Sequence, residues 1–264
     1  MAVLSALATW PEGATLNELS EYLELPRASL HRLLSMLQKA GYLINNAGTY
    51  VLGPETYRLA RQVEHVGQSS ALSRVAIPVI NWLAEATGET VVLGVLSKDR
   101  AEIIYTNVLV ADEPLRCEVP EGVRTPLYSS ASGKAVLAFM PESEYDEYVR
   151  ITKFRKFTEF TDTSEILKDK VPQIRSAGIV KDRGHLLGAW AIASPIFDSG
   201  GDAIGAIAVL GPEARIERVE KQICKSVLEA GRKISLLVGF SGAYPPDTSK
   251  LSAREFARIT GQSE

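Results

Sequence analysis

Residues 15–52 constrain the fold of this chain most, because they predict two short helices joined by a tight turn and followed by a hairpin. Thr15 and Glu18 have the spacing of a capping box, in which each side chain binds the other residue's amide, so a helix should begin at about Leu16. The apolar residues that follow recur at intervals of three and four and predict one buried stripe. These residues are Leu16, Leu19, Tyr22 and Leu23.

A second helix should begin near Arg27 and end at Gly41, because Leu25 and Pro26 form a turn and proline is tolerated in the first helical turn. Its predicted inward stripe consists of Leu30, Leu33, Leu34 and Leu37. Its predicted outward face holds Arg27, Ala28, Ser29, His31, Arg32 and Ser35. No acidic residue lies between Arg27 and Tyr42, whereas four glutamates precede them, so positive charge is concentrated on this helix.

Two short β-prone runs, residues 42–44 and 49–52, complete the pattern. Residues 45–48 between them tolerate positive φ and predict a hairpin turn. The order is that of a winged helix-turn-helix, which makes double-stranded DNA the expected partner. The predicted DNA contacts are Arg27, Ala28, Ser29, His31, Arg32, Ser35, Asn45 and Asn46. The alternative is a helix-turn-helix that mediates protein contacts in a small-molecule sensor.

The composition limits how such a chain can bind DNA. The formal net charge is −3 and the isoelectric point is near 5.8, so attraction to phosphate must come from locally focused charge. We expect a cytoplasmic protein without a membrane partner, since no apolar run reaches membrane-spanning length. Cys117 and Cys224 have no metal-ligand spacing and the three histidines are scattered, so neither a metal site nor a cofactor is expected.

Length and patterning predict two domains, since 264 residues with 45% hydrophobic residues suffice for two cores. We expect a DNA-binding domain at 1–53, a linker helix at 54–70, an α+β sheet domain at 71–240 and a solvated tail at 241–264. Helices are predicted at 71–87, 132–139, 142–150, 164–176 and 216–238, with Pro172 expected to kink or shorten the fourth. Strands are predicted at 90–97, 102–110, 188–197 and 203–210.

The chain resembles a known family, the IclR-type bacterial transcriptional regulators. The resemblance is carried by residues 26–34, 41–42, 49–53, 122–138 and 188–212, and it covers about residues 3–240. It implies a GAF-like effector-binding domain, a small-molecule effector that is often a carboxylate, a DNA operator and a homodimer or homotetramer. Neither repression nor activation leaves a local residue signature.

The turn at residues 129–134, which leads into the helix predicted at 132–139, is the candidate effector site. A helix N-terminus presents unpaired amides and the positive end of the helix dipole, which favour a carboxylate. The resemblance implies a pocket partly built from this turn, and the expected lining is Leu127, Ser130, Ala131, Ser132, Asp182, Leu187, Ala189, Ala191, Ala208 and Leu210. Relatives carry polar residues where this chain has Ala191, Ala208 and Leu210, so we expect an apolar or aromatic effector with one anionic end. Lys134 is expected to pair with a carboxylate for stability.

Catalysis is not predicted. The run at 128–135 departs from a phosphate-binding loop at Tyr128 and Ala135, and Ala131 stands where a Ser-x-x-Lys hydrolase needs its serine. Ser132, His185 and Asp182 remain as a possible nucleophilic set, but three such residues in one domain are common by chance. We expect His185 in an exposed loop and Trp190 in either the core or the pocket wall.

Overall fold

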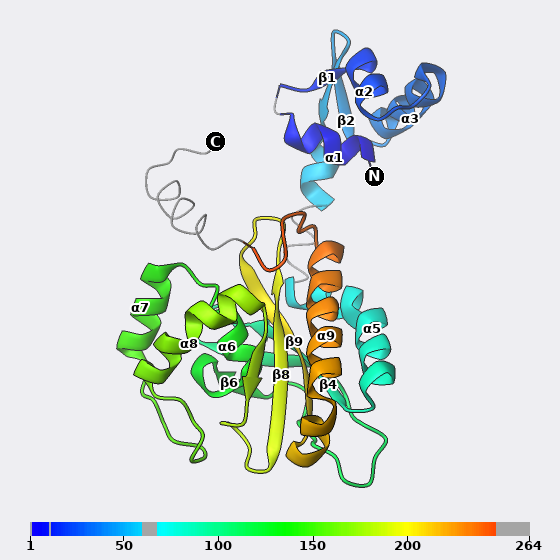
Figure 1. Ribbon diagram of the computed structural model, residues 1–264. Helices are drawn as coiled ribbons and strands as arrows, with labels where there is room; N and C mark the ends of the chain where they lie inside the picture. Colours follow the sequence, from blue (N-terminus) through cyan, green and yellow to red (C-terminus); the bar gives the residue numbers. More distant parts are fainter. Residues whose placement is uncertain (1, 11, 60–67, 247–264) are drawn as a thin grey trace. The chain divides into compact units, whose positions relative to one another are not determined.

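The computed structural model describes residues 2–10, 12–59 and 68–246, and the chain divides into two compact units, Met1–Ala71 and Leu72–Glu264 (Figure 1). In the first unit the helices α1, α2 and α3 pack with a three-stranded antiparallel sheet of order β1-β3-β2, and residues 54–59 after the sheet are also helical. Its elements are α1 (Ala2–Thr9), β1 (Ala14–Thr15), α2 (Leu16–Tyr22), α3 (Arg27–Lys39), β2 (Leu43–Asn46) and β3 (Thr49–Leu52).

Local chemistry sets the boundaries of these elements. The predicted capping box is present: the Thr15 amide donates to the Glu18 carboxylate at 2.7 Å, and the Glu18 amide donates to the Thr15 hydroxyl at 3.4 Å. Gly41 has φ +80° after α3, where the Tyr42 amide reaches back to the Leu37 carbonyl at 2.9 Å. A side chain at Gly41 would strain this turn, so glycine is required there.

Burial along α3 follows the predicted stripe with one exception. Leu30 and Leu34 are fully buried in the core of the first unit, and Leu37 packs against that core from a partly buried position. Leu33 is 37% exposed, so its assignment to the inward stripe was wrong. The core of the first unit is small, so fewer positions around α3 are fully buried than the four leucines predicted.

The second unit is built on a six-stranded antiparallel sheet of order β6-β5-β4-β9-β8-β7. The strands are β4 (Thr90–Leu96), β5 (Glu102–Leu109), β6 (Arg124–Pro126), β7 (Val180–Asp182), β8 (Ala189–Phe197) and β9 (Ala203–Pro212). The helices are α5 (Gln68–Thr87), α6 (Ala131–Leu137), α7 (Glu142–Ile151), α8 (Ser164–Ala177) and α9 (Glu213–Leu237), with a 3₁₀ turn η1 (Leu127–Ser129) ahead of α6.

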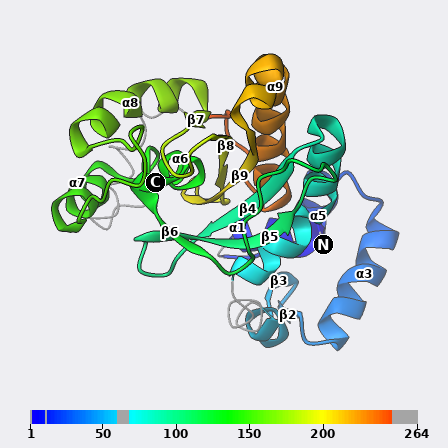
Figure 2. The same cartoon turned by 90° about the horizontal axis from the view of Figure 1, so that it is seen from below.

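Helices cover both faces of this sheet, the arrangement of a GAF-like domain (Figure 2). Along β4 the side chains alternate: Val91 and Leu93 join the core under α5 and α9, whereas Val92 joins the core on the side of α6. Every residue of α6 is buried, so the short helix lies inside the unit rather than on its surface. The α6 side of the sheet is where the candidate effector residues gather.

Three features differ from the sequence-based expectations. Helix α5 begins at Gln68, three residues early, and α8 runs through Pro172 without a break. Pro172 is exposed, where water can bind the carbonyl that loses its helical partner. The short edge strands β6 and β7 were not predicted, because three residues carry too little periodicity. Residues 60–67 of the predicted linker helix lie outside the described residues.

The start of the predicted tail packs against the second unit. The Tyr244 hydroxyl donates to the Pro195 carbonyl at 2.6 Å and lies 2.7 Å from the Ser194 hydroxyl. Gly231 leaves room for it, since a Cβ there would lie 2.2 Å from the Tyr244 oxygen. The solvated tail expected from residue 241 therefore begins after Tyr244 at the earliest, and the capping-box spacing at Ser252 lies outside the described residues.

Candidate DNA-binding surface and effector cavity

The exposed face of α3 carries the residues that we predicted to contact DNA. Residues 27–29, His31 and Arg32 are exposed, and Ser35 is half-buried. Leu30 and Leu34 hold the opposite face in the core, which fixes the direction in which these polar side chains point. Contact between this face and DNA stays a prediction.

The hairpin between β2 and β3 assigns different roles to its two asparagines. The Asn45 side chain accepts a hydrogen bond from the Gly48 amide at 2.8 Å, in a turn where Ala47 and Gly48 have φ +52° and +96°. Asn46 is exposed at the turn. The geometry therefore gives Asn45 a structural role in the wing and leaves Asn46 as the asparagine available to a partner.

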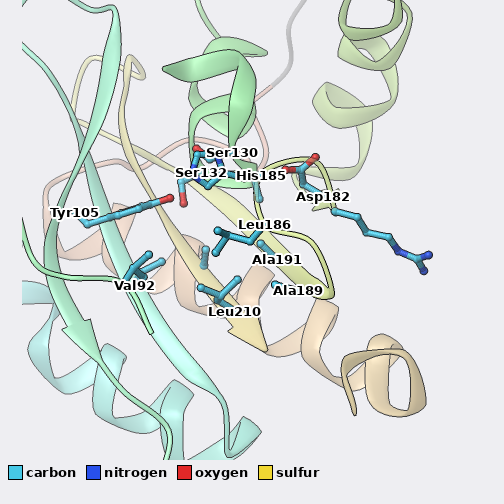
Figure 3. A pocket seen from close by; sticks show the side chains of 14 residues that line it. Val92, Tyr105, Ser130, Ser132, Asp182, His185, Leu186, Ala189, Ala191 and Leu210 are labelled. Carbon is cyan, nitrogen blue, oxygen red and sulfur yellow. The ribbon is translucent and has the colours of Figure 1, made fainter. Parts of the chain in front are cut away.

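A cavity of about 450 Å³, its open mouth included, lies in the second unit between the sheet and the N-terminal end of α6. Figure 3 shows side chains from β4, β5, β8 and β9 on one side and Ser130 and Ser132 on the other. The cavity is lined by Val92, Tyr105, Val119, Ser130, Ala131, Ser132, Asp182, Arg183, His185, Leu186, Ala189, Ala191, Ala208 and Leu210.

Most of the predicted effector residues line this cavity, and two do not. Leu127 is fully buried in the core beneath α6, because the 3₁₀ turn directs its side chain inward. Leu187 is 77% exposed in the loop before β8, and its neighbour Leu186 lines the cavity instead. The sequence analysis did not predict Val92, Tyr105, Val119, Arg183, His185 and Leu186 as lining residues. The pairing of β4 with β5 brings Val92 and Tyr105 to the site, whereas Val119 lies in the loop before β6.

Hydroxyl groups form the polar end of the cavity. The Tyr105 phenol lines this end together with Ser130 and Ser132, and the Ser130 hydroxyl lies 3.2 Å from the Thr125 hydroxyl. Burial raises the pKa of Tyr105, so the phenol stays neutral at physiological pH. Ser130 also caps α6 by accepting from the Gly133 amide at 3.2 Å. This end can therefore donate hydrogen bonds to an acceptor on a ligand without carrying a charge of its own.

Close packing holds that end in place. A Cβ on Gly133 would lie 2.3 Å from the Leu127 carbonyl oxygen, so only glycine allows α6 to approach η1 this closely. The Tyr148 hydroxyl accepts from the Tyr128 amide at 3.1 Å and secures the same turn from α7. The backbone around Ser130 is thus restrained from two sides.

A buried charge cluster lies behind the cavity wall. The Lys134 ammonium, on a side chain only 1% exposed, pairs with Asp182 and, at 2.7 Å, with Asp162. Lys170 binds the second oxygen of Asp162 at 2.6 Å. Burial alone would raise the pKa of Asp162, but the Lys134 and Lys170 ammonium groups outweigh it and hold that pKa below its usual value. Lys134 pairs with carboxylates as expected, and the pairing neutralises the Asp182 charge beside the cavity.

His185 lies in the loop before β8 but is not exposed, so the expected exposure was wrong. Its ring is half-buried, lines the cavity and packs at 5.0 Å from the Phe157 ring. Burial lowers the pKa of His185 from its ordinary value of 6.5, so the neutral form of the ring predominates at physiological pH. The tertiary contact with Phe157, 28 positions earlier, is what draws this loop inward.

Arg183, which follows Asp182 in the chain, also has its charge paired with another side chain. The Arg183 guanidinium lies 4.1 Å above the Trp190 ring and binds Glu213 at 2.6 Å. Trp190 itself belongs to the core under α5 and α9, so of its two expected places the core is the one observed. The rest of the lining is mainly aliphatic, with Val92, Ala191 and Leu210 facing Leu186 across the cavity (Figure 3).

The possible nucleophilic set is brought to the cavity but is not connected as a catalytic triad. Asp182 pairs with Lys134, and among the described residues the buried Nδ1 of His185 has no hydrogen-bond partner. A triad requires the aspartate to orient the histidine and the histidine to bind the serine. Among the residues that the structure describes, no group of three or more His, Cys, Asp or Glu side chains is placed to hold a metal ion. Within the same residues, no helix is long and apolar enough to span a membrane.

Comparisons with known proteins agree with this architecture. A family model described as "Bacterial transcriptional regulator IclR C-terminal" matches residues 64–236, and one described as "IclR helix-turn-helix domain" matches residues 1–46. The DNA-binding transcriptional repressor YiaJ of Escherichia coli is 31% identical over 250 residues, which cover 91% of this chain and 86% of YiaJ. The transcriptional repressor IclR of the same organism is 28% identical over 245 residues, which cover 90% of this chain and 88% of that protein.

Solved structures extend the likeness to the fold. The repressor BlcR of Agobacterium tumefaciens matches with a TM-score of 0.69 at 22% identity, over 91% of this chain and 96% of the BlcR chain. HmgR of Pseudomonas aeruginosa matches with a TM-score of 0.67 at 23% identity, over 91% and 96% of the two chains. Two family models in order and a relative above 30% identity together decide the assignment. The chain belongs to the IclR family of bacterial transcriptional regulators.

Proposed function

We propose that this IclR-family regulator binds its operator through α3 and the wing, and that a small effector with an apolar body and one carboxylate occupies the cavity and sets its affinity for DNA. The observation that carries the proposal is the cavity itself, in which hydroxyl donors gather at one end and aliphatic side chains at the other. An effector with one polar end matches that division.

The polar end suits a carboxylate for two reasons. Ser130, Ser132 and Tyr105 offer hydroxyl groups, and the first-turn amides of α6 at Ala131 and Ser132 point toward the same end of the helix. Asp182 would repel an anion if it were unpaired, but its ion pair with Lys134 removes most of that repulsion. An aliphatic or aromatic body would fill the space lined by Ala191, Ala208 and Leu210.

Regulation would follow from assembly. A homodimer or homotetramer would place two α3 helices in successive major grooves of a pseudo-palindromic operator, and the effector would bias their relative orientation. A coupling free energy of about 1 to 3 kcal/mol would change DNA affinity by about five- to 150-fold. We place this activity in the cytoplasm, with DNA and the effector as partners and without catalysis.

Matched ligands test the effector class. We expect branched-chain or aromatic monocarboxylic acids to raise the melting temperature of the chain, because a ligand at 100 times its Kd stabilises the folded state by about 2.7 kcal/mol. Their primary amides should have no effect, since they lack the charge. Ala191→Leu should remove the stabilisation by filling the cavity, whereas Ala177→Leu, an exposed control on α8, should preserve it. Binding of small hydrophilic acids alone would contradict the proposal.

Fluorescence anisotropy with duplexes tiled from the region upstream of the coding sequence tests DNA recognition. We expect one duplex to bind tightly, with an affinity that falls at higher salt. Arg32→Ala should weaken that binding by about 1 to 3 kcal/mol and relax preference at one base pair, because Arg32 lies opposite the buried side of α3. Lys156→Ala removes an equally exposed charge in the second unit and should change nothing. Equal weak binding to every duplex would contradict sequence-specific recognition.

A further inference from the structure

A large apolar side chain lies unexplained on the exposed face of α3. Met36 is 66% exposed, the highest value among the large hydrophobic residues described in the first unit. Leaving a side chain of this kind in water forgoes the favourable free energy of its burial. The predicted DNA contacts on α3 do not include it.

The helical repeat places Met36 with the polar residues of that face. It lies one turn after Arg32 and two turns after Ser29, so the three positions form one stripe with spacing i, i+3 and i+7. Leu30 and Leu34, both fully buried, lie on the other side of the helix. Recognition helices that lie along a major groove, such as that of the homeodomain, read bases with residues at this spacing.

The surroundings of Met36 favour a nucleic acid as its partner over an apolar protein surface. Arg32 and Lys39, one turn away on either side, are exposed cations, and α3 contains no acidic residue. The two cations suit a partner with anionic groups on either side of the contact, and the apolar side chain between them suits a single apolar group on that partner. The major groove of DNA is such a surface, because thymine presents a C5 methyl there and no other standard base does.

We propose that Met36 is a specificity-determining residue that packs against the C5 methyl of a thymine in each operator half-site. The inference rests on the proposed entry of α3 into the major groove. Methionine suits this contact, since its unbranched, polarisable thioether adapts to a neighbour's shape. Met36 would thereby discriminate thymine from cytosine by apolar contact, while Arg32 reads an adjacent base by hydrogen bonding.

Removal of single methyl groups tests the proposal. The probe is the tightest duplex selected from a randomised pool by the wild-type chain, with each thymine replaced in turn by deoxyuridine, which lacks only the methyl. We expect replacement at one position in each half-site to weaken wild-type binding about fourfold, as burial of one methyl group predicts. Met36→Ala should bind the unmodified duplex about five- to tenfold more weakly and should be indifferent to deoxyuridine at that position.

Two controls separate this contact from a general effect. Met36→Leu keeps an apolar side chain and should retain the deoxyuridine response, whereas Leu115→Ala, at a residue 70% exposed in the second unit, should leave DNA binding unchanged. Equal thermal stability of wild type and Met36→Ala will show that the exposed substitution does not unfold the unit.

Three results would overturn the proposal. In the first, Met36→Ala keeps the wild-type affinity and the wild-type deoxyuridine profile. In the second, it binds every duplex more weakly but keeps that profile, which would place Met36 in a protein contact. In the third, selection enriches no duplex, which would overturn the proposed function together with this inference, whereas the first two leave the proposed function standing.

Discussion

Lys134→Met is expected to destabilise the second unit by about 3 to 5 kcal/mol, because removing one partner of a buried ion pair leaves uncompensated charge in the core. Lys134 is 1% exposed, and its loss would leave Asp182 without its ion-pair partner and Asp162 with only Lys170. Methionine preserves most of the side-chain volume, so a cavity does not confound the result. Urea denaturation followed by circular dichroism measures the change.

The matched control removes the charge left behind. Lys134→Met combined with Asp182→Asn should recover part of the lost stability, because one unpaired carboxylate is then neutral. Lys181→Met, which breaks an exposed pair with Glu220, should change stability by less than about 1 kcal/mol. Equal, small effects of Lys134→Met and Lys181→Met would contradict a buried, structurally important cluster.

The effect of Lys134→Met should also depend on pH. The pKa of Asp162 lies below its ordinary value of 3.8 in the folded chain, so its stabilising contribution is present above about pH 4 and is lost as the pH falls through the folded-state pKa. In the variant, loss of the Lys134 charge should raise the pKa of Asp162, which should then take up a proton at a higher pH than in the wild type. The stability difference between wild type and variant should therefore narrow as the pH falls from 7 toward 4. A difference independent of pH would show that charge is not its cause.

Leu34→Ala should destabilise the first unit by about 2 to 5 kcal/mol, since it removes a fully buried leucine from a small core. Leu34 helps hold α3 against the rest of the unit, so DNA binding should fall with the loss of stability. The unfolding transition of the second unit should be unchanged, because the two units have separate cores. Hydrogen exchange resolved by segment measures both units in one experiment.

A leucine at the surface of the same unit provides the control. Leu25→Ala removes an equal side chain from a 38% exposed position and should leave both protection and DNA binding near the wild-type values. Loss of protection in both units after Leu34→Ala would contradict their independence.

Features encoded by neighbouring residues were predictable from the sequence. The capping box of Thr15 and Glu18, the end of α3 at Gly41 and the hairpin around Gly48 depend on contacts within a few residues, and the structure contains all of them. The four long strands of the second unit were predictable for the same reason, since alternation and turn residues are local signals.

The cavity was predictable in part. Ser130, Asp182 and Ala208 were named from the family resemblance and line it, but Tyr105 and Val119 were not, because nothing near them in the sequence signals a shared site. His185 was misplaced because its burial depends on packing against Phe157. Leu33 was misplaced because a leucine stripe in the sequence does not show how many of its side chains the core is large enough to cover.

The sequence by itself determined the family, the order of the two domains and the concentration of positive charge on α3, and it placed the start of α6 within one residue. Each of these follows from residue types at short, fixed spacings. Only the tertiary structure decided which strands lie side by side, that Lys134 neutralises two aspartates far along the chain, and which side chains face the cavity. These depend on contacts between residues tens of positions apart, and such contacts exist only after the sheet has formed and its core has packed.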